Sequence, residues 1–499
     1  MEVLRRAVCG ALSTDRGQDP NPVRGGRSGR RHGSRPRRPE CHGPESWCLH
    51  AARLAPDGPK TMTRPLLLLF ASLLLALPRA APAQDLEAER VRIHGSNVLG
   101  HRVMPALARA WLGEAGYGEL RTRRVDGRFE IHARRGDERV IVEIHTPGSA
   151  GAFRALIDGE AEVGMSARVP TAKELDEAWL VGRLRSPDQE YVVGLDGLAL
   201  VVHPDNPLQA LSREQLRQVF SGRVRDWSQL GGRAGAITVV GLRADSGGHE
   251  LLSTLLLDGG RQVPTTWVQA DSRAVAAAVA RDPRAIGYLP VGLDAAGVRP
   301  LAVSAGGQAV LPTRVNVMAE DYPLTRRLYL YGGQLMSALG RSLANYAISP
   351  AGQAVVARSG MLALTPRALA ADPPADAPED YAQMLVGAQR LGLNLRFGKE
   401  YTVLDSRGAQ DLERVIAYLR EPANRGRELM LMAFADPDAG GPARALFLSQ
   451  DRVDFVADLL GQAGVKVSRR RGFGGRAVLA AGDGEHARFV NERVELWVR

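Results

Sequence analysis

The sequence predicts two α/β domains that follow an N-terminal apolar segment. Strand-like and helix-like patterns alternate over residues 89–365, and they alternate again toward the C-terminus. A Pro-, Ala- and Asp-rich stretch without apolar periodicity, residues 371–380, separates the two runs. A length of 499 residues suits two or three domains. We therefore expect a first, mainly parallel α/β domain over 84–370, a linker over 371–384 and a smaller domain over 385–499.

Residues 62–83 (MTRPLLLLFASLLLALPRAAPA) have the pattern of a secretory signal peptide. One arginine precedes an apolar run from Leu66 to Leu77, and Ala81-Pro82-Ala83 matches the A-x-A cleavage pattern. The run is shorter than the roughly 20 residues that a transmembrane helix needs. We expect residues 1–61 to be a disordered or wrongly assigned extension, with Met62 as the true start.

The net charge of +10 does not indicate a nucleic-acid-binding protein. Residues 1–61 hold twelve Lys and Arg against six Asp and Glu, and residues 62–83 add two Arg. Only +2 of the formal charge therefore remains for residues 84–499, and no basic stripe with interleaved aromatics follows. The three cysteines, Cys9, Cys41 and Cys48, all precede the signal. We therefore expect no disulfide and no lipid anchor in the rest of the chain. No later apolar run is long enough for a transmembrane span.

One local unit occurs three times in the first domain: a strand, a turn with small and hydroxyl side chains, and a helix. The turns are Gly95-Ser96-Asn97, Gly148-Ser149 and the segment from Arg243 to Gly248, which includes Ser246 and Gly247. The start of a helix carries free N–H groups and a partial positive charge. Glycine allows a ligand to approach the backbone, and serine adds a hydroxyl donor. Several such turns at one sheet edge predict an anion site, although a single serine in this position is more often a simple helix cap.

The first domain resembles the periplasmic phosphate-binding proteins of ABC importers. The motifs that carry the likeness are HGSN (94–97), GSAGAFRALIDGEAEVGMSAR (148–168), HPDNPLQALSREQLRQVFSGRVRDWSQLGG (203–232), AIGYLP (285–290), YPLTRRLYLY (322–331) and SPAGQ (349–353). The resemblance implies a two-lobed periplasmic-binding-protein fold, with crossover strands between the lobes and phosphate or a related oxyanion as the ligand. We expect neither an enzyme activity nor a cofactor.

The resemblance assigns anion-binding roles to particular residues. They are the serines and their neighbours in the turns, together with two arginines: Ser96, Asn97, Ser149, Ser166, Arg168, Arg243, Ser246 and Gly247. Two positions depart from the family pattern. Ala167 stands where some members have an aspartate that accepts a proton from hydrogen phosphate, and His249 replaces a threonine. An oxyanion site is therefore expected, but the preference for phosphate does not follow.

The second domain predicts a compact β-α-β-α-β sandwich. Its strands are expected at 393–397, 428–434 and 493–498. Leu412, Val415, Ile416 and Leu419 mark one helix, and Ser449 is expected to cap the next.

This domain is similar to the OmpA-like peptidoglycan-binding family. The likeness rests on five segments: NLRFGKEYTVLDSRGAQDLERVIAYL (394–419), AFAD (433–436), LSQDR (448–452), GFG (472–474) and NERVE (491–495). The resemblance implies that Asp436 and Arg452 bind the ammonium and the carboxylate of a diaminopimelate peptide, with Arg452 in the first turn of a helix. The alternative is that Asp436 caps a loop and Arg452 makes a surface ion pair.

Together these features predict a periplasmic oxyanion-binding protein that is tethered to peptidoglycan near the outer membrane. Two alternatives stay open. One is a scaffolding protein of the cell envelope whose first domain binds a protein partner or no ligand. The other is the receptor of a phosphate importer. Neither a G-x-S-x-G motif nor an H-E-x-x-H motif is present, so we expect neither a nucleophile nor a metal site.

Overall fold

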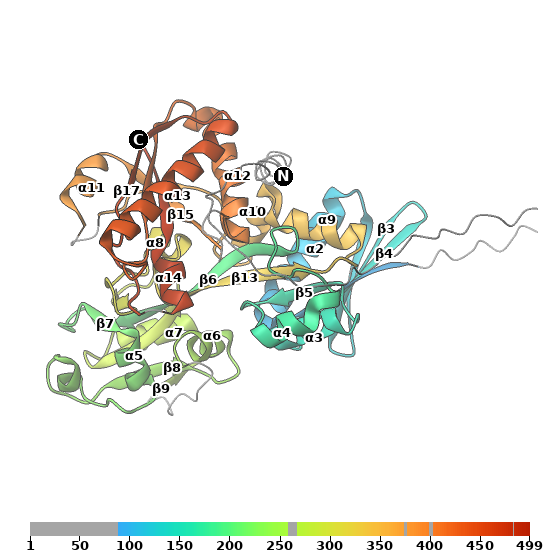
Figure 1. Ribbon diagram of the computed structural model, residues 1–499. Coiled ribbons are helices and arrows are strands. Elements are labelled where there is room, and N and C mark those ends of the chain that lie inside the picture. Colours follow the sequence, from blue (N-terminus) through green and yellow to red (C-terminus); the bar gives the residue numbers. More distant parts are fainter. Residues whose placement is uncertain (1–87, 258–266, 374–376, 399–402, 483) are drawn as a thin grey trace, which may run out of the picture. The chain divides into compact units, whose positions relative to one another are not determined.

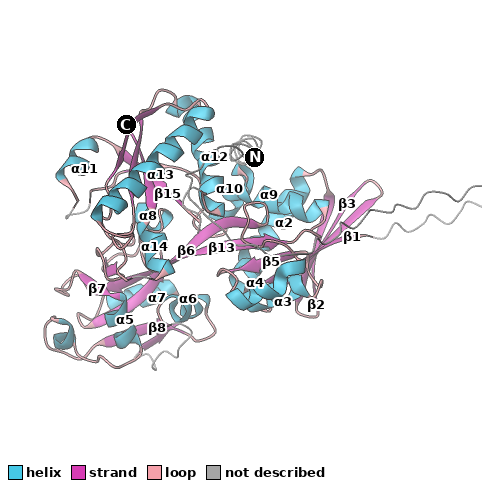
Figure 2. Cartoon of the chain, viewed as in Figure 1, coloured by secondary structure: helices cyan, strands magenta, loops and turns pink. Residues whose placement is uncertain are grey.

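The computed structural model describes residues 88–257, 267–373, 377–398, 403–482 and 484–499 (Figures 1 and 2). All of them belong to one compact unit that runs from Leu86 to Arg499. The predicted extension over 1–61 and the predicted signal peptide over 62–83 lie outside the described residues.

The first lobe contains half of a large mixed β-sheet, with its strands in the order β2-β3-β4-β1-β5. The strands are β1 (Glu89–Gly95), β2 (Gly118–Val125), β3 (Arg128–Arg135), β4 (Glu138–His145) and β5 (Val163–Ser166). The helices are the π-helical turn η1 (Leu99–Val103), α2 (Met104–Glu114), α3 (Ser149–Ile157), α4 (Ala172–Glu177), η2 (Ala178–Leu180), α9 (Ala338–Ile348) and α10 (Pro350–Arg358).

Helix α2 covers one face of this half-sheet, as its apolar spacing predicts. Met104, Leu107, Ala108 and Trp111 are all buried, and they pack in one core with residues such as Val91 of β1. The same face buries alternate residues of the strands, which is the expected pattern for a strand with one covered side.

The second lobe continues the same sheet through β6, β10, β8 and β9. Its strands are the distal part of β6 (Glu190–Val202), β7 (Ala210–Ser212), β8 (Thr238–Leu242), β9 (Trp267–Gln269), β10 (Ala285–Pro290), β11 (Arg299–Pro300) and β12 (Ala302–Ser304). The helices are α5 (Arg213–Phe220), η3 (Trp227–Leu230), α6 (Gly247–Leu255), α7 (Ser272–Val279) and α8 (Arg314–Met318). Phe220 and Trp227 of the 203–232 motif are buried, and the indole N–H of Trp227 donates to the carbonyl of Arg284 at 2.9 Å.

Two crossover strands join the lobes. β6 pairs with β13 (Thr325–Gly332) in antiparallel register. At one end β13 pairs with β5, and at the other end β6 pairs with β10. The prediction of a mainly parallel sheet is therefore wrong. The crossover strands are antiparallel, and the tight turns at Asp126-Gly127 and Gly136-Asp137 turn β2, β3 and β4 into antiparallel hairpins.

The C-terminal domain has its own five-stranded sheet, with the strand order β14-β15-β18-β16-β17. Its strands are β14 (Ala368–Leu369), β15 (Gln389–Arg396), β16 (Leu429–Phe434), β17 (Val467–Gly472) and β18 (Arg493–Val498). Its helices are α11 (Glu379–Met384), α12 (Ser406–Arg420), η4 (Pro422–Asn424), α13 (Pro442–Gln462) and α14 (Glu485–Asn491). Three strands and two helices correspond to the predicted β-α-β-α-β order. β17, whose arginines are mostly exposed, was not predicted.

The second predicted helix begins earlier than expected. α13 starts at Pro442, after Gly441 at φ 102°, and not at Ser449. A proline suits the first turn of a helix because the N–H that it lacks has no intrahelical partner there. Ser449 is buried in mid-helix, where its hydroxyl donates to the carbonyl of Leu446 at 2.9 Å.

The predicted linker is partly structured. Residues 379–384 of the predicted linker form helix α11, and Tyr381 of this helix is buried in the C-terminal core. The Tyr381 hydroxyl donates to Glu495 at 2.6 Å, and its ring packs on Phe434 and Phe473. The segment, whose composition resembles a spacer, is therefore anchored by Tyr381 together with the neighbouring Leu385, which is also buried in this core.

Buried ion pairs join the C-terminal domain to the first domain. Glu320, just after α8, accepts from Arg327 of β13 at 2.6 and 2.8 Å, and it pairs with Arg407 of α12 at 2.8 Å. Asp321 pairs with Arg390 of β15 at 2.7 Å. Burial alone would raise the pKa of Glu320, but Arg327 and Arg407 hold that pKa well below its ordinary value.

We expect Glu320→Gln to destabilise the protein by about 3–5 kcal/mol, because the substitution leaves buried guanidinium groups without their counter-charge. The difference from wild type should shrink as the pH falls below about 4, where the wild-type carboxylate starts to lose the stability that its lowered pKa supplies. Chemical denaturation at several pH values measures both effects. Glu114→Gln, at an exposed position on α2, is the matched control. Equal stability of the two variants at neutral pH would contradict this account.

Candidate anion-binding site

Two of the three predicted turns, at 95–97 and 148–149, meet at one edge of the first-lobe sheet together with the turn that follows β5 at 166–168. The third predicted turn, at 243–248, follows β8 in the second lobe. β1 is parallel to both β4 and β5, with Ile93 opposite Ile144 and Gly95 opposite Met165. The carboxyl ends of the three strands therefore lie side by side, and the turns that follow them are neighbours.

Backbone hydrogen bonds hold these turns together at Gly95. The Ser96 N–H donates to the carbonyl of Met165 at 2.8 Å, and the Gly148 N–H donates to the carbonyl of Gly95 at 3.0 Å. Gly95 has a φ of 139°, and a Cβ atom there would lie 2.0 Å from the Met165 oxygen. Only glycine fits at this position. Ser96 is buried, whereas Asn97 is exposed.

Ser149 and Ser166 connect the second turn to the third. Ser149 is the first residue of α3, and its Oγ accepts from the Ala167 N–H at 3.0 Å. Ser166 ends β5 and is fully buried, and its hydroxyl donates to the carbonyl of Arg168 at 2.6 Å. Because Ser149 acts as an acceptor in this contact, its own O–H stays available to donate to a ligand.

Arg168 is already bound to a carboxylate. Its two terminal nitrogens lie 2.7 Å from the two carboxylate oxygens of Glu174, and its guanidinium lies 5.1 Å from the centre of the Phe153 ring. Burial would raise the pKa of Glu174, but the hydrogen bonds from Arg168 and Thr171 lower it below its ordinary value. Sequence reasoning missed Glu174. The capping pattern Thr171-x-x-Glu174 was the available signal.

The predicted residues of the second lobe lie after β8. Arg243 is exposed and binds Asp245, with nitrogen–oxygen distances of 3.2 and 2.8 Å. The hydrogen bond from Arg243 lowers the pKa of the Asp245 carboxyl. Ser246 caps α6 by accepting from the His249 N–H at 3.2 Å, and Gly247 is the first residue of that helix.

The structure thus forms two groups from the predicted anion-binding residues. Ser96, Ser149, Ser166 and Arg168 come together in the first lobe. Arg243, Ser246 and Gly247 lie in the second lobe, with β13, β6 and β10 between β5 and β8 in the sheet. Among the residues that the structure describes, no hydrogen bond or ion pair joins the two groups.

The residues predicted to bind peptidoglycan are both buried. Asp436 follows β16 and accepts from the Asp438 N–H at 2.8 Å. Arg452 lies in the middle of α13 and not in its first turn, because the helix begins at Pro442. Its guanidinium pairs with Glu492 at 2.7 Å and lies 4.9 Å from the centre of the Phe397 ring. Sequence reasoning did not single out Glu492, although the residue lies within the NERVE motif.

Four motifs of the C-terminal domain nevertheless converge around the turn at 472–474. The Gly474 carbonyl accepts from the Ala435 N–H at 2.9 Å, and the Gly474 N–H donates to the Ser449 hydroxyl at 2.9 Å. The Gly472 N–H donates to the Gln450 side chain at 3.0 Å. The Arg452–Glu492 pair adds the NERVE segment to this assembly.

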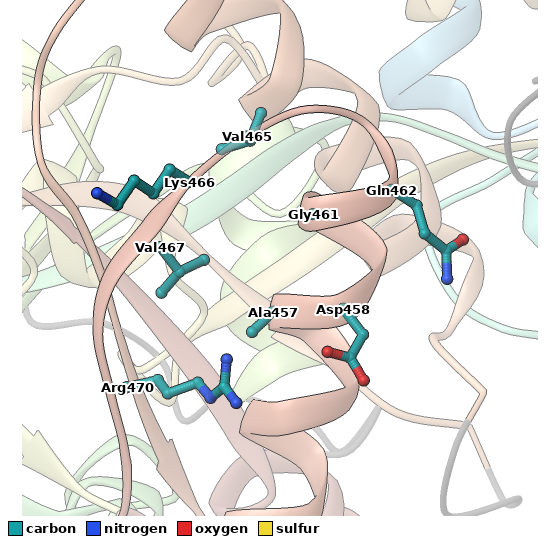
Figure 3. Close-up of a pocket in the computed structure, with 8 residues that line it drawn as sticks. All are labelled: Ala457, Asp458, Gly461, Gln462, Val465, Lys466, Val467 and Arg470. Atoms are coloured by element: carbon teal, nitrogen blue, oxygen red, sulfur yellow. The ribbon is translucent and has the colours of Figure 1, made fainter.

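A pocket of about 510 Å³ lies elsewhere on the C-terminal domain, between α13 and β17 (Figure 3). It is lined by residues of the end of α13 and the start of β17: Ala457, Asp458, Gly461, Gln462, Val465, Lys466, Val467 and Arg470. None of the predicted site residues lines it, so it adds nothing to either predicted site.

In the ranges that the structure describes, no group of three or more His, Cys, Asp and Glu side chains is placed to hold a metal ion. No helix in the described part of the chain has the length and apolar character of a membrane span.

Comparison with known proteins relates the first domain to binding proteins. Residues 137–351 match the sequence model of the PBP superfamily domain. The phosphate-binding protein PstS of Pseudomonas aeruginosa is 26% identical over 250 residues, which cover 45% of this chain and 75% of the relative. PstS of Bacillus subtilis is 26% identical over 208 residues, covering 41% and 65%.

Solved structures of two binding proteins also match. An ABC-type phosphate transport receptor from Vibrio cholerae has 21% identity and a TM-score of 0.44, over 55% of this chain and 99% of that one. A possible phosphate-binding protein from Planctomyces limnophilus has 18% identity and a TM-score of 0.46, over 60% and 97%. The sheet topology and the PBP superfamily match together identify the first domain as a two-lobed α/β domain of the periplasmic-binding-protein type.

We expect Gly95→Ala to destabilise the protein by at least about 3 kcal/mol, because the new methyl group meets the Met165 carbonyl and the φ angle suits only glycine. Thermal unfolding measures the loss. Gly113→Ala is the control, because this helical glycine has open space around its Cβ position. It should raise stability by about 0.5–1 kcal/mol. If Gly95→Ala left stability unchanged, the close packing of the turns described here would be wrong.

Proposed function

We propose that this chain is a periplasmic binding protein for phosphate or a related oxyanion, and not an enzyme. The observation that carries the proposal is the group of three turns at one sheet edge, with Ser96, Ser149 and Ser166 joined around Gly95. The names of the relatives, which are phosphate-binding proteins, agree with it. Export to the periplasm rests on the signal-peptide pattern of residues 62–83.

The donors of the proposed site would be hydroxyls, backbone N–H groups and arginines. The N-termini of α3 and of the helical segment after Ser96 offer N–H groups to an anion. Arg168 would contribute positive charge, although Glu174 occupies both of its terminal nitrogens. Arg243 could exchange the exposed Asp245 carboxylate for the oxyanion, since both acceptors fit the same guanidinium fork.

Phosphate is only one candidate within this class of ligand. Ala167 offers no carboxylate to accept the proton of hydrogen phosphate, so a site of this kind need not distinguish phosphate from sulfate by that means. The names of the relatives favour phosphate. A receptor that delivers phosphate to an importer is the closest alternative, and the transport receptor from Vibrio cholerae favours it. A scaffolding protein without a small ligand is the other.

Titration calorimetry of the full chain with phosphate and with sulfate tests the first proposal. We expect Ser149→Ala to weaken binding by about tenfold to a hundredfold, because a hydrogen bond to a charged acceptor contributes about 1.5–3 kcal/mol. Ser186→Ala, in the same lobe, is the control and should bind like the wild type. The absence of heat with every oxyanion would favour the scaffolding alternative.

We further propose that the C-terminal domain binds the peptide of peptidoglycan and tethers the protein to the cell wall. The supporting observation is the convergence of four family motifs around the turn at 472–474. Asp436 and a guanidinium would together hold the ammonium and carboxylate of diaminopimelate. Arg452 is buried and already paired with Glu492. To bind the carboxylate of diaminopimelate, Arg452 would have to leave Glu492 or to bind both carboxylates at once.

Retention by purified cell-wall sacculi tests this second proposal. We expect Asp436→Asn to lose retention, because the amide keeps the shape of the side chain but removes the charge that would face the ammonium group. Asp438→Asn, two residues away and exposed, is the matched control and should be retained. Equal retention of both variants would sink the proposal. Arg452→Ala is unsuitable, since it would leave the buried Glu492 without its partner.

A further inference from the structure

One face of the first-lobe sheet carries a two-dimensional array of arginines. Residues that pair directly across neighbouring strands point to the same face of a sheet. Arg121 of β2 pairs with His132 of β3, which pairs with Ile141 of β4, which pairs with Arg90 of β1. In the next row, one step of two residues along, Arg123, Glu130, Glu143 and Arg92 are paired in the same way.

Further basic residues extend this face, which we call the arginine face. Arg128 lies opposite Val125, and Arg134 lies opposite Arg139. The arginines of the face are all exposed: Arg90, Arg92, Arg121, Arg123, Arg128, Arg134 and Arg139. The carboxylates in the two rows are Glu130 and Glu143. Glu130 lies opposite Arg123 and contacts His132 at 2.8 Å, and Glu143 lies opposite Arg92 and binds Arg90.

The arginine face exposes its arginines to solvent, in contrast to the opposite face of the same strands. The opposite face carries Val91, Ile93, Ile131 and Val142, which are fully buried in the core with α2. On the arginine face, α3 packs where Leu156 and Ala152 lie against Gly164 of β5. Ile141 of the first row is buried, whereas the arginines around it are exposed. Strands β3 and β4 are labelled at the outer end of the lobe in Figure 1.

Positive charge is in excess on this face, because seven arginines stand against the two carboxylates Glu130 and Glu143. Among the described residues, no carboxylate lies within ion-pair distance of Arg92, Arg121, Arg123 or Arg128. Like charges in adjacent rows repel one another and bring no gain in stability. This local excess of positive charge favours an external anionic partner.

We propose that the arginine face docks on the surface of an anionic lipid bilayer through the phosphates of the headgroups. The arginines come from four adjacent strands, about 4.8 Å apart, so they spread over an area and do not follow a groove. A layer of headgroup phosphates presents charge in the same way, and guanidinium groups bind phosphate oxygens in pairs.

A single-stranded nucleic acid fits this face less well. Binding of that kind uses aromatic side chains on which the bases stack. In β1 to β4 the one Phe, Tyr or Trp residue is Phe129, which pairs with Ile144 and packs against the core on the opposite face. The arginine face is also separate from the proposed oxyanion site, which uses the turns beyond the carboxyl ends of β1, β4 and β5.

Co-sedimentation of the full chain with vesicles tests the docking surface. The probe vesicles contain phosphatidylglycerol and phosphatidylcholine in equal parts, and pure phosphatidylcholine vesicles are the neutral reference. We expect Arg121→Gln/Arg123→Gln/Arg128→Gln to lower the partition coefficient for anionic vesicles by at least about tenfold. All three side chains are exposed, so the melting temperature should stay close to that of the wild type.

A matched triple variant tests whether the loss of binding is specific to the arginine face or follows from any loss of positive charge. Arg223→Gln/Arg233→Gln/Arg281→Gln removes the same charge from exposed positions of the second lobe and should bind like the wild type. Arg121→Lys/Arg123→Lys/Arg128→Lys should keep most of the binding. Since every variant carries residues 1–87, their contribution cancels in the comparison. Saturating inorganic phosphate should not displace the vesicles, because it would occupy the separate oxyanion site.

Several results would overturn the proposal. These are equal loss in both glutamine triples, equal binding to neutral and anionic vesicles, and binding that survives about 1 M salt, where charges are screened within about 3 Å. Displacement of the vesicles by phosphate would indicate that the protein binds the vesicles through the oxyanion site. Binding of an oligonucleotide through the same arginines, without vesicle binding, would assign the face to a different partner.

Discussion

Two adjacent carboxylates of the first domain, Glu320 and Asp321, hold the C-terminal domain in place by binding its Arg390, Arg396 and Arg407. Glu320 also binds Arg327 of the first domain. Glu320 has a φ of 59°, a backbone conformation that costs a non-glycine residue about 1–3 kcal/mol. The surrounding guanidinium groups compensate for this cost. The charges are buried, so each depends on the others. Removal of one carboxylate would leave buried guanidinium groups without a counter-charge.

This cluster couples the C-terminal domain to the crossover strands. Arg327 lies on β13 and also binds Asp405, at the start of α12, at 2.5 Å. On the other crossover strand, the Gln410 side chain of α12 donates to the carbonyl of Glu190 at 3.1 Å. The contacts therefore involve both strands that join the lobes of the proposed oxyanion site. If the C-terminal domain binds the cell wall, it is in direct contact with the strands that connect the lobes. It is not joined to the first domain by a linker alone.

In the two proposed sites, the arginines form ion pairs with carboxylates of the protein itself. Glu174 binds Arg168, Asp245 binds Arg243, and Glu492 binds Arg452. A carboxylate has the same charge and much of the same geometry as the groups that these arginines are proposed to recognise. The exposed Arg243–Asp245 pair is the easiest of the three to exchange, because solvent screens it and supplies alternative partners. The buried Arg452–Glu492 pair is the hardest.

Local patterns in the sequence were enough to predict the α/β class, the buried face of α2, and the turns at Ser96, Ser149 and Arg243. These features depend on residue periodicity and on short-range backbone rules. Three others were decided by tertiary contacts: the order in α11, where Tyr381 finds an apolar core; the start of α13 at Pro442, which moves Arg452 from the first turn to mid-helix; and the partners Glu174, Glu320 and Glu492. An isolated Asp, Glu or Arg in a sequence carries no sign of its ion-pair partner, because that partner is chosen by the packing of distant elements.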